Sequence, residues 1–324
     1  MSGTVSWGFL STAHINDKLL AGAARSDRVD VIAVASRDAE RAEAYARERG
    51  IERAYGTYEE LLADPDVEAV YISLPNSLHV EWSIRALEAG KHVLCEKPMS
   101  RRPEDVERAF DVAEESNRLL MEAFMFRHNP QTAKVKELVV GGAIGRLRLV
   151  RAAFSFPLTD AENVRLKASL DGGGLMDVGC YCVSGARLLG GEPGRVYGEQ
   201  VLSDSGVDEL FTGTMRFPGD VIAHFDAGLV VQERAELEAI GEEGSLFLDD
   251  PWHCHRPVIE LRTADGIKEI ALEPVDSYRL QLENVSDAIR GGAEPLLARD
   301  DALGQARAIE ALYRSAAEGR PVSL

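Results

Sequence analysis

Apolar and polar positions follow two different rhythms along this chain, and the change falls near residue 125. Before it, short runs rich in Val and Ile alternate with stretches of helical spacing, which predicts strands followed by helices. The predicted strands are Thr4–Leu10, Val29–Ala35, Val67–Leu74, His92–Cys95 and Leu119–Phe124. The predicted helices are His14–Arg25, Ala39–Arg49, Tyr58–Leu62, Leu78–Ala89 and Pro103–Ser116. Strands that alternate with helices indicate an α/β fold with a parallel, doubly wound sheet of Rossmann type.

Beyond residue 125, a predicted helix at Gln131–Val140 precedes Arg146–Phe156, whose alternation is that of a half-exposed strand. A glycine cluster and a helix occupy Gly172–Leu189. Further strand-like runs, separated by turn signals, are Val196–Leu202, Glu209–Phe217, Val221–Val230, Ala235–Ile240, Ser245–Leu248 and Val258–Arg262. These runs predict an antiparallel sheet, and two helices, Tyr278–Arg290 and Ala302–Ala317, close the chain.

We therefore expect two domains, as 324 residues exceed what one ordinary core organises. A dinucleotide-binding Rossmann domain would span residues 1–124. An α+β domain with a large, mostly antiparallel open sheet would span residues 125–324 and serve substrate binding and oligomerisation. The C-terminal helix could pack back on the Rossmann domain.

Composition narrows the class of partner. The net charge of -18 repels the phosphates of nucleic acids and anionic membrane surfaces, so neither is an expected partner. No apolar stretch approaches the ~18–20 residues of a membrane span, and the first residues lack the pattern of a signal peptide. The four cysteines show no disulfide framework, so we expect a cytoplasmic protein.

The turn after the first strand is where a Rossmann fold holds the cofactor pyrophosphate. A literal G-x-G-x-x-G is absent, and Ser11, Ala13 and Asn16 stand at its three spaced positions. Because Ser11 and Ala13 are small, the motif is weakened and not excluded, and an αβ unit without a ligand weighs equally on this turn alone. The residues expected at the cofactor phosphates are Ser11, Thr12, Ala13, His14 and Ile15.

The end of the second strand bears on the choice of cofactor. NAD enzymes usually carry Asp or Glu here to bind the ribose hydroxyls, whereas this chain has Ser36-Arg37. A hydroxyl and a guanidinium suit the 2′-phosphate of NADP, so NADP is favoured and NAD stays possible. Asp38 is expected to cap the next helix. The plain alternative for Arg37 is a solvated surface arginine.

Two motifs carry candidate chemistry. Glu96-Lys97-Pro98 follows a predicted strand, and ligands of open α/β sheets bind at the carboxyl ends of strands. The second motif is a run of three glycines, Gly172–Gly174, ahead of Asp177 and Tyr181, which are four apart and share one helix face. An Asp and a Tyr that converge on a cleft make a proton-transfer site. The alternatives are a surface lysine in a turn, a surface Asp and a buried tyrosine.

The combination resembles the glucose–fructose oxidoreductase/inositol dehydrogenase/MocA family along nearly the whole chain. The matching stretches are Val70–His79, His92–Pro98, Glu122–Gln131, Asn163–Tyr181 and Tyr278–Arg290. Tyrosine at position 181 is similar to the branch of NADP-dependent xylose dehydrogenase and dimeric dihydrodiol dehydrogenase, whereas the inositol-type branch usually has histidine. The degenerate first turn departs from the family's glycine fingerprint.

The resemblance implies the roles of the site residues. Tyr181 would be the general acid/base on the reacting oxygen, and Lys97 would favour its phenolate and bind the substrate hydroxyl. Asp177 would orient the sugar or Lys97, and Arg165 would bind substrate hydroxyls. The cofactor residues of the second half of the sheet would be Leu74, Asn76, His79, Glu96 and Lys97. Hydride moves to or from the nicotinamide itself.

The function expected from these residues is hydride transfer between a nicotinamide and a sugar or cyclic polyol, foremost the anomeric carbon of an aldose. A trans-dihydrodiol dehydrogenase and a keto-sugar reductase are alternatives, and a non-catalytic NADP-binding sensor is a third. The chain is expected to form a homodimer or homotetramer through the open sheet. No metal is expected, because adjacent residues of His253-Cys254-His255 would point opposite ways on a strand and no fourth ligand has finger-like spacing.

Overall fold

The structure is a computed structural model that describes residues 3–160 and 162–324. These residues form two compact units. The first unit contains the described residues up to Met125 together with Tyr278–Leu303, and the second contains Phe126–Ser277 and Gly304–Leu324. The segment Tyr278–Leu303 therefore folds with the first unit, whereas our assignment from the sequence places it in the second domain.

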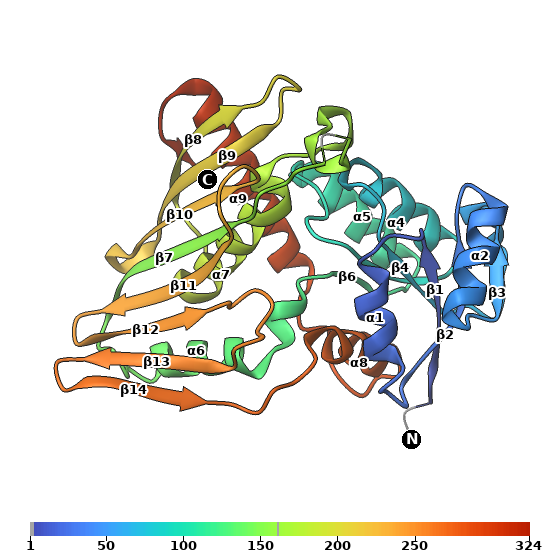
Figure 1. Ribbon diagram of the computed structural model, residues 1–324, viewed down its shortest axis with the longest axis horizontal. Coiled ribbons are helices and arrows are strands. Elements are labelled where there is room, and N and C mark those ends of the chain that lie inside the picture. Colours follow the sequence, from blue (N-terminus) through green and yellow to red (C-terminus); the bar gives the residue numbers. More distant parts are fainter. Residues whose placement is uncertain (1–2, 161) are drawn as a thin grey trace. The chain divides into compact units, whose positions relative to one another are not determined.

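The first unit is built on a parallel sheet of six strands in the order β3-β2-β1-β4-β5-β6 (Figure 1). Its strands are β1 (Val5–Leu10), β2 (Val29–Ala35), β3 (Arg53–Tyr55), β4 (Ala69–Ile72), β5 (His92–Cys95) and β6 (Leu120–Glu122). Its helices are α1 (Asn16–Ala23), α2 (Ala39–Arg49), α3 (Tyr58–Ala63), α4 (His79–Glu88), α5 (Pro103–Glu115) and α8 (Ser277–Ile289), with a short 3₁₀ turn, η1 (Asn76–Leu78). This order confirms the predicted doubly wound α/β fold.

Local signals explain where these elements begin and end. The Asp38 side chain accepts the backbone N–H of Arg41 and caps α2, as expected, and Gly50 ends that helix in the left-handed region. Thr57 and Glu60 form a capping box at the start of α3. The strand β3 was not predicted, because its three residues are all half-buried and carry no apolar run.

The second unit contains a sheet of nine strands in the order β14-β13-β12-β11-β7-β10-β9-β8-β15. The strands are β7 (Leu147–Ser155), β8 (Arg195–Leu202), β9 (Asp208–Arg216), β10 (Ile222–Gly228), β11 (Arg234–Gly241), β12 (Gly244–Asp249), β13 (Val258–Thr263), β14 (Gly266–Ala271) and β15 (Val322–Ser323). Neighbouring strands are antiparallel except for β7 and β10, which pair in parallel. The prediction of a mostly antiparallel sheet is confirmed.

Helices cover one face of this sheet. They include α6 (Pro130–Val140) and α7 (Cys180–Gly190), and the long helix α9 (Arg299–Glu318) extends into this unit. Short helical turns are η2 (Met125–His128), η3 (Val164–Leu166), η4 (Ala168–Leu170), η6 (Pro218–Asp220) and a π-turn, η5 (Leu175–Gly179). In Figure 1, α6 and α7 lie against one face of the sheet, and no helix of the described chain covers the opposite face.

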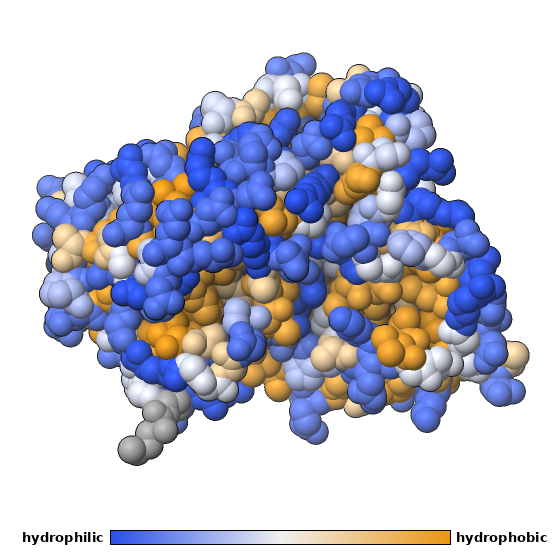
Figure 2. All heavy atoms as spheres, turned by 180° about the vertical axis from the view of Figure 1, so that it is seen from behind, coloured by the Kyte–Doolittle hydropathy of each residue, from blue (hydrophilic) through white to orange (hydrophobic). Residues whose placement is uncertain are grey.

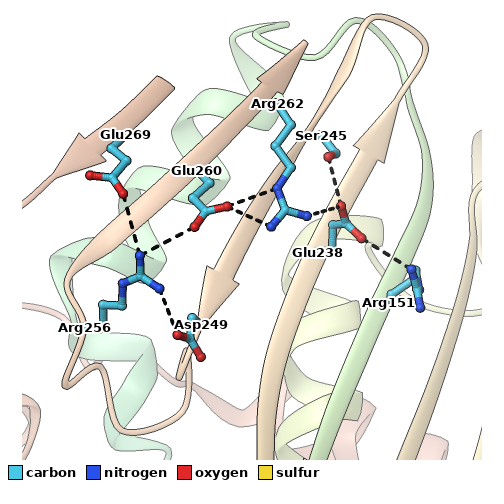
Figure 3. Close-up of polar contacts among 8 residues, drawn as sticks. All are labelled: Arg151, Glu238, Ser245, Asp249, Arg256, Glu260, Arg262 and Glu269. Carbon is cyan, nitrogen blue, oxygen red and sulfur yellow. Dashed lines mark hydrogen bonds and ion pairs between the residues drawn. The ribbon is translucent and has the colours of Figure 1, made fainter. Parts of the chain in front are cut away.

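Alternating charges occupy the uncovered face (Figure 3). Glu238 lies between Arg151 and Arg262, at 3.6 and 3.4 Å, and Glu260 lies between Arg262 and Arg256, at 2.8 and 3.6 Å. Each of these glutamates contacts two arginines, and with Asp249 and Glu269 on Arg256 the row sets four carboxylates against three guanidinium groups. The same face also carries apolar side chains, among them Phe247, which pairs with Glu238 and Glu260 across the strands and lies beneath the Arg262 guanidinium, 4.1 Å from its ring centroid.

The strand β14 was not predicted, because all its residues but one are exposed and its sequence, GIKEIA, lacks a buried face.

Seen from the side opposite to that of Figure 1, hydrophilic residues are interspersed with apolar ones over the surface (Figure 2). Within residues 3–160 and 162–324, no helix has both the length and the apolar character to cross a bilayer.

Candidate active site

A first group of candidate site residues lies at the carboxyl edge of the parallel sheet. Strands β1 and β4 are neighbours there, and the chain continues from them in opposite directions across the sheet, so this is its topological switch point. Ser11 follows β1 and Ser73 follows β4, and their hydroxyl oxygens lie 2.8 Å apart. Open α/β sheets bind their ligands at this position.

The turn after β1 keeps the backbone of a glycine turn without the glycine. Ser11 has φ of 120°, a conformation that glycine adopts readily and other residues rarely do. The Ser11 hydroxyl donates to the Ser73 carbonyl (3.0 Å) and accepts the backbone N–H of Ala13 (3.1 Å). Asn16 is fully buried; its amide donates to the Ser11 carbonyl (2.8 Å), and its side-chain oxygen accepts the Ser73 hydroxyl (2.7 Å). Four polar contacts therefore hold a strained turn in place.

The same turn corrects the predicted start of the first helix. The helix α1 begins at Asn16, so His14 and Ile15 belong to the turn that precedes it. Thr12, Ala13 and Ile15 are half-buried, and His14 is exposed. These residues therefore form the turn that leads into α1, in which the Ala13 backbone N–H is bound to the Ser11 hydroxyl.

At the end of β2, Ser36 is buried and Arg37 is exposed. The Ser36 backbone N–H donates to the Tyr55 carbonyl (3.0 Å), which ties this end to β3. Burial raises the pKa of Tyr58, and the guanidinium groups of Arg37 and Arg41 oppose that rise, which places both arginines near the Tyr58 hydroxyl. Two cations at this strand end favour binding of a phosphate.

The Glu96-Lys97-Pro98 motif follows β5. The Tyr71 hydroxyl of β4 donates to Glu96 Oε1 at 2.5 Å, and the Lys97 backbone N–H donates to Glu96 Oε2 at 3.2 Å. Glu96 and Lys97 are half-buried, and the peptide bond between Lys97 and Pro98 is cis. The next backbone N–H, that of Met99, donates to Glu122 Oε1 at 2.7 Å. Two carboxylates thus fix the backbone on both sides of the Lys97-Pro98 bond.

His79, which is expected to line the cofactor pocket, lies between two backbone carbonyls that follow β4 and β5. Its side chain is 1% exposed, and its two ring nitrogens lie 2.9 Å from the Pro98 carbonyl and 2.8 Å from the Leu74 carbonyl. A ring held between two backbone carbonyls positions the segments after β4 and β5, and we therefore interpret His79 as a support for the site. Leu74 is also buried, whereas Asn76 opens η1 and is half-buried.

A second group of candidate site residues belongs to the second unit and begins at the glycine cluster. The Gly173 N–H donates to the Arg165 carbonyl (2.9 Å), and a Cβ on Gly172 would lie 2.3 Å from that same carbonyl oxygen. Gly173 has φ of 126°, and a Cβ there would lie 2.1 Å from Asp208 Oδ1. The glycines are thus required for a close approach of the backbone to the loop that carries Arg165.

This approach brings Arg165 and Asp177 together. Arg165 Nε donates to Asp177 Oδ2 at 2.6 Å, with the Arg165 side chain 42% exposed and that of Asp177 14% exposed. Asp177 lies in the π-turn η5 and Tyr181 in the first turn of α7, so the predicted single helix is a π-turn that runs into an α-helix. π-turns of this kind occur often at functional sites.

Aromatic rings surround Tyr181, which is half-buried. Its ring centroid lies 5.7 Å from that of Phe126, 5.3 Å from that of Phe154 and 6.0 Å from that of Trp252. Trp252 packs against α7 where Gly185 leaves room, because a Cβ on Gly185 would lie 2.9 Å from the indole ring. These contacts fix the phenol ring and leave its hydroxyl as the polar end.

The cysteines on either side of Tyr181 are buried and free. Burial raises the pKa of Cys182 well above its ordinary value, so the thiol is neutral at physiological pH. Cys180 Sγ lies 3.5 Å from the Asp177 carbonyl. Both act as small packing residues.

Several supporting residues were not found from the sequence. Ser73, Tyr71 and Glu122 support the residue group of the first unit. Asp208 supports the group of the second unit by accepting the backbone N–H of Leu175 (2.6 Å) and the hydroxyl of Tyr313 (2.8 Å). Ser73 could have been suspected, because it directly follows a strand at the carboxyl edge of the sheet. The other three carry no local signal.

Comparison with known proteins identifies the family. Residues 7–124 match the model described as "Oxidoreductase family, NAD-binding Rossmann fold", and residues 132–247 match the GFO/IDH/MocA C-terminal domain. The chain is 38% identical over 323 residues to D-xylose 1-dehydrogenase (NADP(+)) 2 of Haloferax volcanii, an alignment that covers 98% of this chain and 99% of that relative. The chain therefore belongs to the GFO/IDH/MocA family of oxidoreductases.

Solved structures agree with this assignment along the whole chain. Aldose-aldose oxidoreductase from Caulobacter crescentus, complexed with glycerol, has a TM-score of 0.92 at 29% identity, covering 99% of this chain and 100% of that one. A 3-ketoreductase from Actinomadura kijaniata, in complex with NADP and TDP-benzene, has a TM-score of 0.91 at 30% identity, covering 96% of this chain and 98% of that one.

Proposed function

We propose that this oxidoreductase uses NADP and transfers a hydride between the nicotinamide and a carbon of a sugar or cyclic polyol, foremost the anomeric carbon of an aldose. The observation that carries the proposal is the 2.6 Å contact between Arg165 and Asp177, one helical turn before Tyr181. Carboxylate, guanidinium and phenol at one end of α7 are donors and acceptors suited to a polyhydroxylated ligand. The likeness to a xylose dehydrogenase supports the same substrate class.

The cofactor proposal rests on the first unit. The strained turn at Ser11 would face the pyrophosphate, and Ser36 with Arg37 would bind the 2′-phosphate. The relative from Haloferax volcanii and the ketoreductase from Actinomadura kijaniata are both described with NADP, which supports this choice. When bound, the nicotinamide supplies or accepts the hydride.

The chain's own residues would manage the proton. Tyr181 would exchange a proton with the reacting oxygen of the substrate, and the Lys97 ammonium would favour its phenolate form. Arg165 and Asp177 would bind the neighbouring hydroxyls of the sugar, so that the reacting carbon is held in one orientation. This role requires Lys97 and Tyr181 to reach the same substrate.

A keto-sugar reductase is the second candidate, because the 3-ketoreductase from Actinomadura kijaniata has a TM-score of 0.91 to this chain. Its chemistry is the reverse direction with the same groups: Tyr181 would then donate the proton to a carbonyl oxygen. A trans-dihydrodiol is a further diol substrate within this class, as the relative trans-1,2-dihydrobenzene-1,2-diol dehydrogenase of Xenopus laevis suggests, at 35% identity over 66% of this chain and 66% of that relative.

The test is cofactor absorbance with NADP⁺, and separately NAD⁺, across aldoses, inositols and trans-dihydrodiols, followed by NADPH with keto-sugars. Turnover of pentoses or hexoses with NADP⁺ preferred supports the first proposal. Turnover only of keto-sugars supports the second. Tight NADP binding without turnover in either direction would contradict both and favour a non-catalytic sensor.

We also propose that the charged open face of the second sheet joins copies of the chain into a homodimer or homotetramer. The alternating row from Arg151 to Glu269 in Figure 3 offers charges of both signs to a second copy. Light scattering at micromolar concentration tests this, and a monomer would overturn it. A dimer that dissociates on reversing the charge of Arg151 would support it.

A further inference from the structure

The turn between β12 and β13 brings two histidines and an aspartate together. Asp250 Oδ1 lies 2.8 Å from His253 Nδ1, and Asp250 Oδ2 lies 3.0 Å from His255 Nδ1. The ligand atoms of all three side chains lie within 4.8 Å of one another. The two imidazole rings are parallel within 6°, with centroids 5.3 Å apart.

Two arguments from the sequence stand against a metal site at His253-Cys254-His255, and the structure answers both. The segment is a turn and not a strand: Asp250 and Cys254 have φ of 56° and 57°, and Trp252 and Cys254 point inward while His253 and His255 lie on the outer side. The further ligand is the carboxylate of Asp250 at the start of the same turn, and it does not have the ligand spacing of a zinc finger.

We propose that Asp250, His253 and His255 form a binding site for one divalent transition-metal ion of the zinc, cobalt or nickel type. An ion about 2.1 Å from each of two ligands separates them by about 3.0–3.4 Å at square to tetrahedral angles. The two Asp–His separations, one through each oxygen of the Asp250 carboxylate, lie within a few tenths of an ångström of this spacing, and the ligand atoms of the two histidines lie within 4.8 Å of each other. Two imidazoles and one carboxylate suit these ions, whereas Mg²⁺ and Ca²⁺ prefer oxygen ligands alone.

The surrounding turn is held in place before any ion binds. Trp252 is fully buried, and its indole N–H donates to the Ala153 carbonyl at 2.9 Å. Gln131 donates to the carbonyls of Arg256 and Val258, at 2.9 Å each, which fixes the far end of the turn. Preorganisation of this kind reduces the ordering that binding requires.

Local charge also favours a cation. The side chains of Asp249 and Arg256 meet across the base of the turn at 2.9 Å, and Glu260 and Glu269 lie 3.6 and 3.7 Å from the same arginine (Figure 3). Glu260 is shared between Arg256 and Arg262, so these guanidinium groups are paired with carboxylates, and the Asp250 carboxylate adds a further negative charge beside them.

The proposed metal site would restrain the aromatic rings that pack around Tyr181. The Phe154 ring contacts the His253 ring at 5.4 Å, edge to face, and the Tyr181 ring at 5.3 Å. Trp252, in the same turn, also contacts Tyr181. An ion that fixes His253 therefore restrains the rings that hold the phenol, without itself touching it.

The experiment is equilibrium dialysis of the chelator-treated, tag-free protein against Zn²⁺, with Co²⁺ absorption as a spectroscopic check of imidazole ligation. One equivalent of Zn²⁺ is expected to bind at micromolar concentration. Binding should weaken at least tenfold in His255→Ala and in His253→Ala. The His255 side chain is 74% exposed, so its removal should leave the fold intact.

The matched control is His224→Ala, which removes an exposed histidine from β10. It should leave the binding and the Co²⁺ spectrum unchanged. A Cys254→Ser variant should also retain the ion, because that thiol is buried and directed at the Pro251 carbonyl, 3.1 Å away. Absence of saturable Zn²⁺ binding to the wild-type protein, or binding that His255→Ala leaves unchanged, would overturn the proposal.

Discussion

Arg165 Nε donates to Asp177 Oδ2 at 2.6 Å across a cluster of three glycines. The contact depends on the glycine cluster, because the Gly173 N–H donates to the Arg165 carbonyl and holds the loop that carries Arg165. We predict that Arg165→Met and Asp177→Asn each lower kcat/KM for the sugar by about tenfold or more, since each leaves the other group misoriented. The double variant should lose little more than either single one. Fully additive losses would show that the pair does not act as a unit.

Lys97 and Tyr181 are expected to matter for chemistry more than for binding. Lys97→Met and Tyr181→Phe should each reduce kcat by about 10²-fold or more, because proton transfer is lost. The affinity for NADP, measured by fluorescence titration, should stay within a few fold. Lys136→Met on α6 and Tyr197→Phe on β8 are matched controls that should retain activity. Near-normal turnover in Tyr181→Phe would rule out its acid/base role.

Arg37 should set the choice between the two nicotinamide cofactors. Arg37→Ala removes a cation near the Tyr58 hydroxyl at the end of β2. The ratio of kcat/KM for NADP⁺ to that for NAD⁺ should fall by about tenfold or more, since an Arg–phosphate contact is charge-assisted. Arg47→Ala, an exposed arginine on α2, should leave the ratio unchanged. An unchanged ratio in Arg37→Ala would place the 2′-phosphate elsewhere.

Gly173→Ala should destabilise the second unit more than a strained backbone alone would. The new Cβ would lie 2.1 Å from Asp208 Oδ1, so Asp208 would lose its place beside Leu175. The control is Gly206→Ala, which has φ of 81° and no atom within 4 Å of the Cβ position. Urea denaturation should show a loss of roughly 1–3 kcal/mol for the control and a larger one for Gly173→Ala. Equal losses would mean that Asp208 moves freely.

Acid should weaken the first unit through His92. Burial, reinforced by the Arg118 guanidinium, lowers the pKa of His92 from 6.5 to about 4. The unfolded chain therefore binds a proton that the folded chain does not, and stability present above pH 6.5 is lost as the pH falls toward 4, by at most about 1.4 kcal/mol for each pH unit. His92→Asn keeps an acceptor for the Leu119 N–H and should show a shallower loss in denaturation between pH 7 and 5. The same slope in both proteins would exclude His92 as the source.

The pattern of apolar and polar residues was sufficient to predict the elements that bury a continuous apolar run. The strand β4 is buried at every position, and the predicted strand Val67–Leu74 encloses it. Even Asn16, at the third position of a missing glycine motif, could be singled out from spacing. Its function could not, since the amide closes the turn only through Ser73, which lies 57 residues away.

The features that could not be predicted from the sequence depend on contacts between distant segments. Asp208 and Tyr71 act on the site through single hydrogen bonds to residues in other elements, and no periodicity reports such a bond. The segment with His253 and His255 was expected as a solvated loop between two strands, but the left-handed backbone of Asp250 and Cys254, which shapes its turn, was not foreseen. The return of Tyr278–Leu303 to the first unit likewise follows from tertiary packing alone.

The parallel pairing of β7 with β10 has a consequence for folding during synthesis on the ribosome. Both sheet neighbours of β7, the strands β10 and β11, lie beyond residue 221, whereas β7 itself ends at Ser155. At translation speeds of about 5–20 residues per second, the central strand waits roughly 3–13 s with both hydrogen-bonding edges open. During that interval a nascent chain exposes an unpaired template to its neighbours, so slow codons between β7 and β10 would lengthen the window for misassembly.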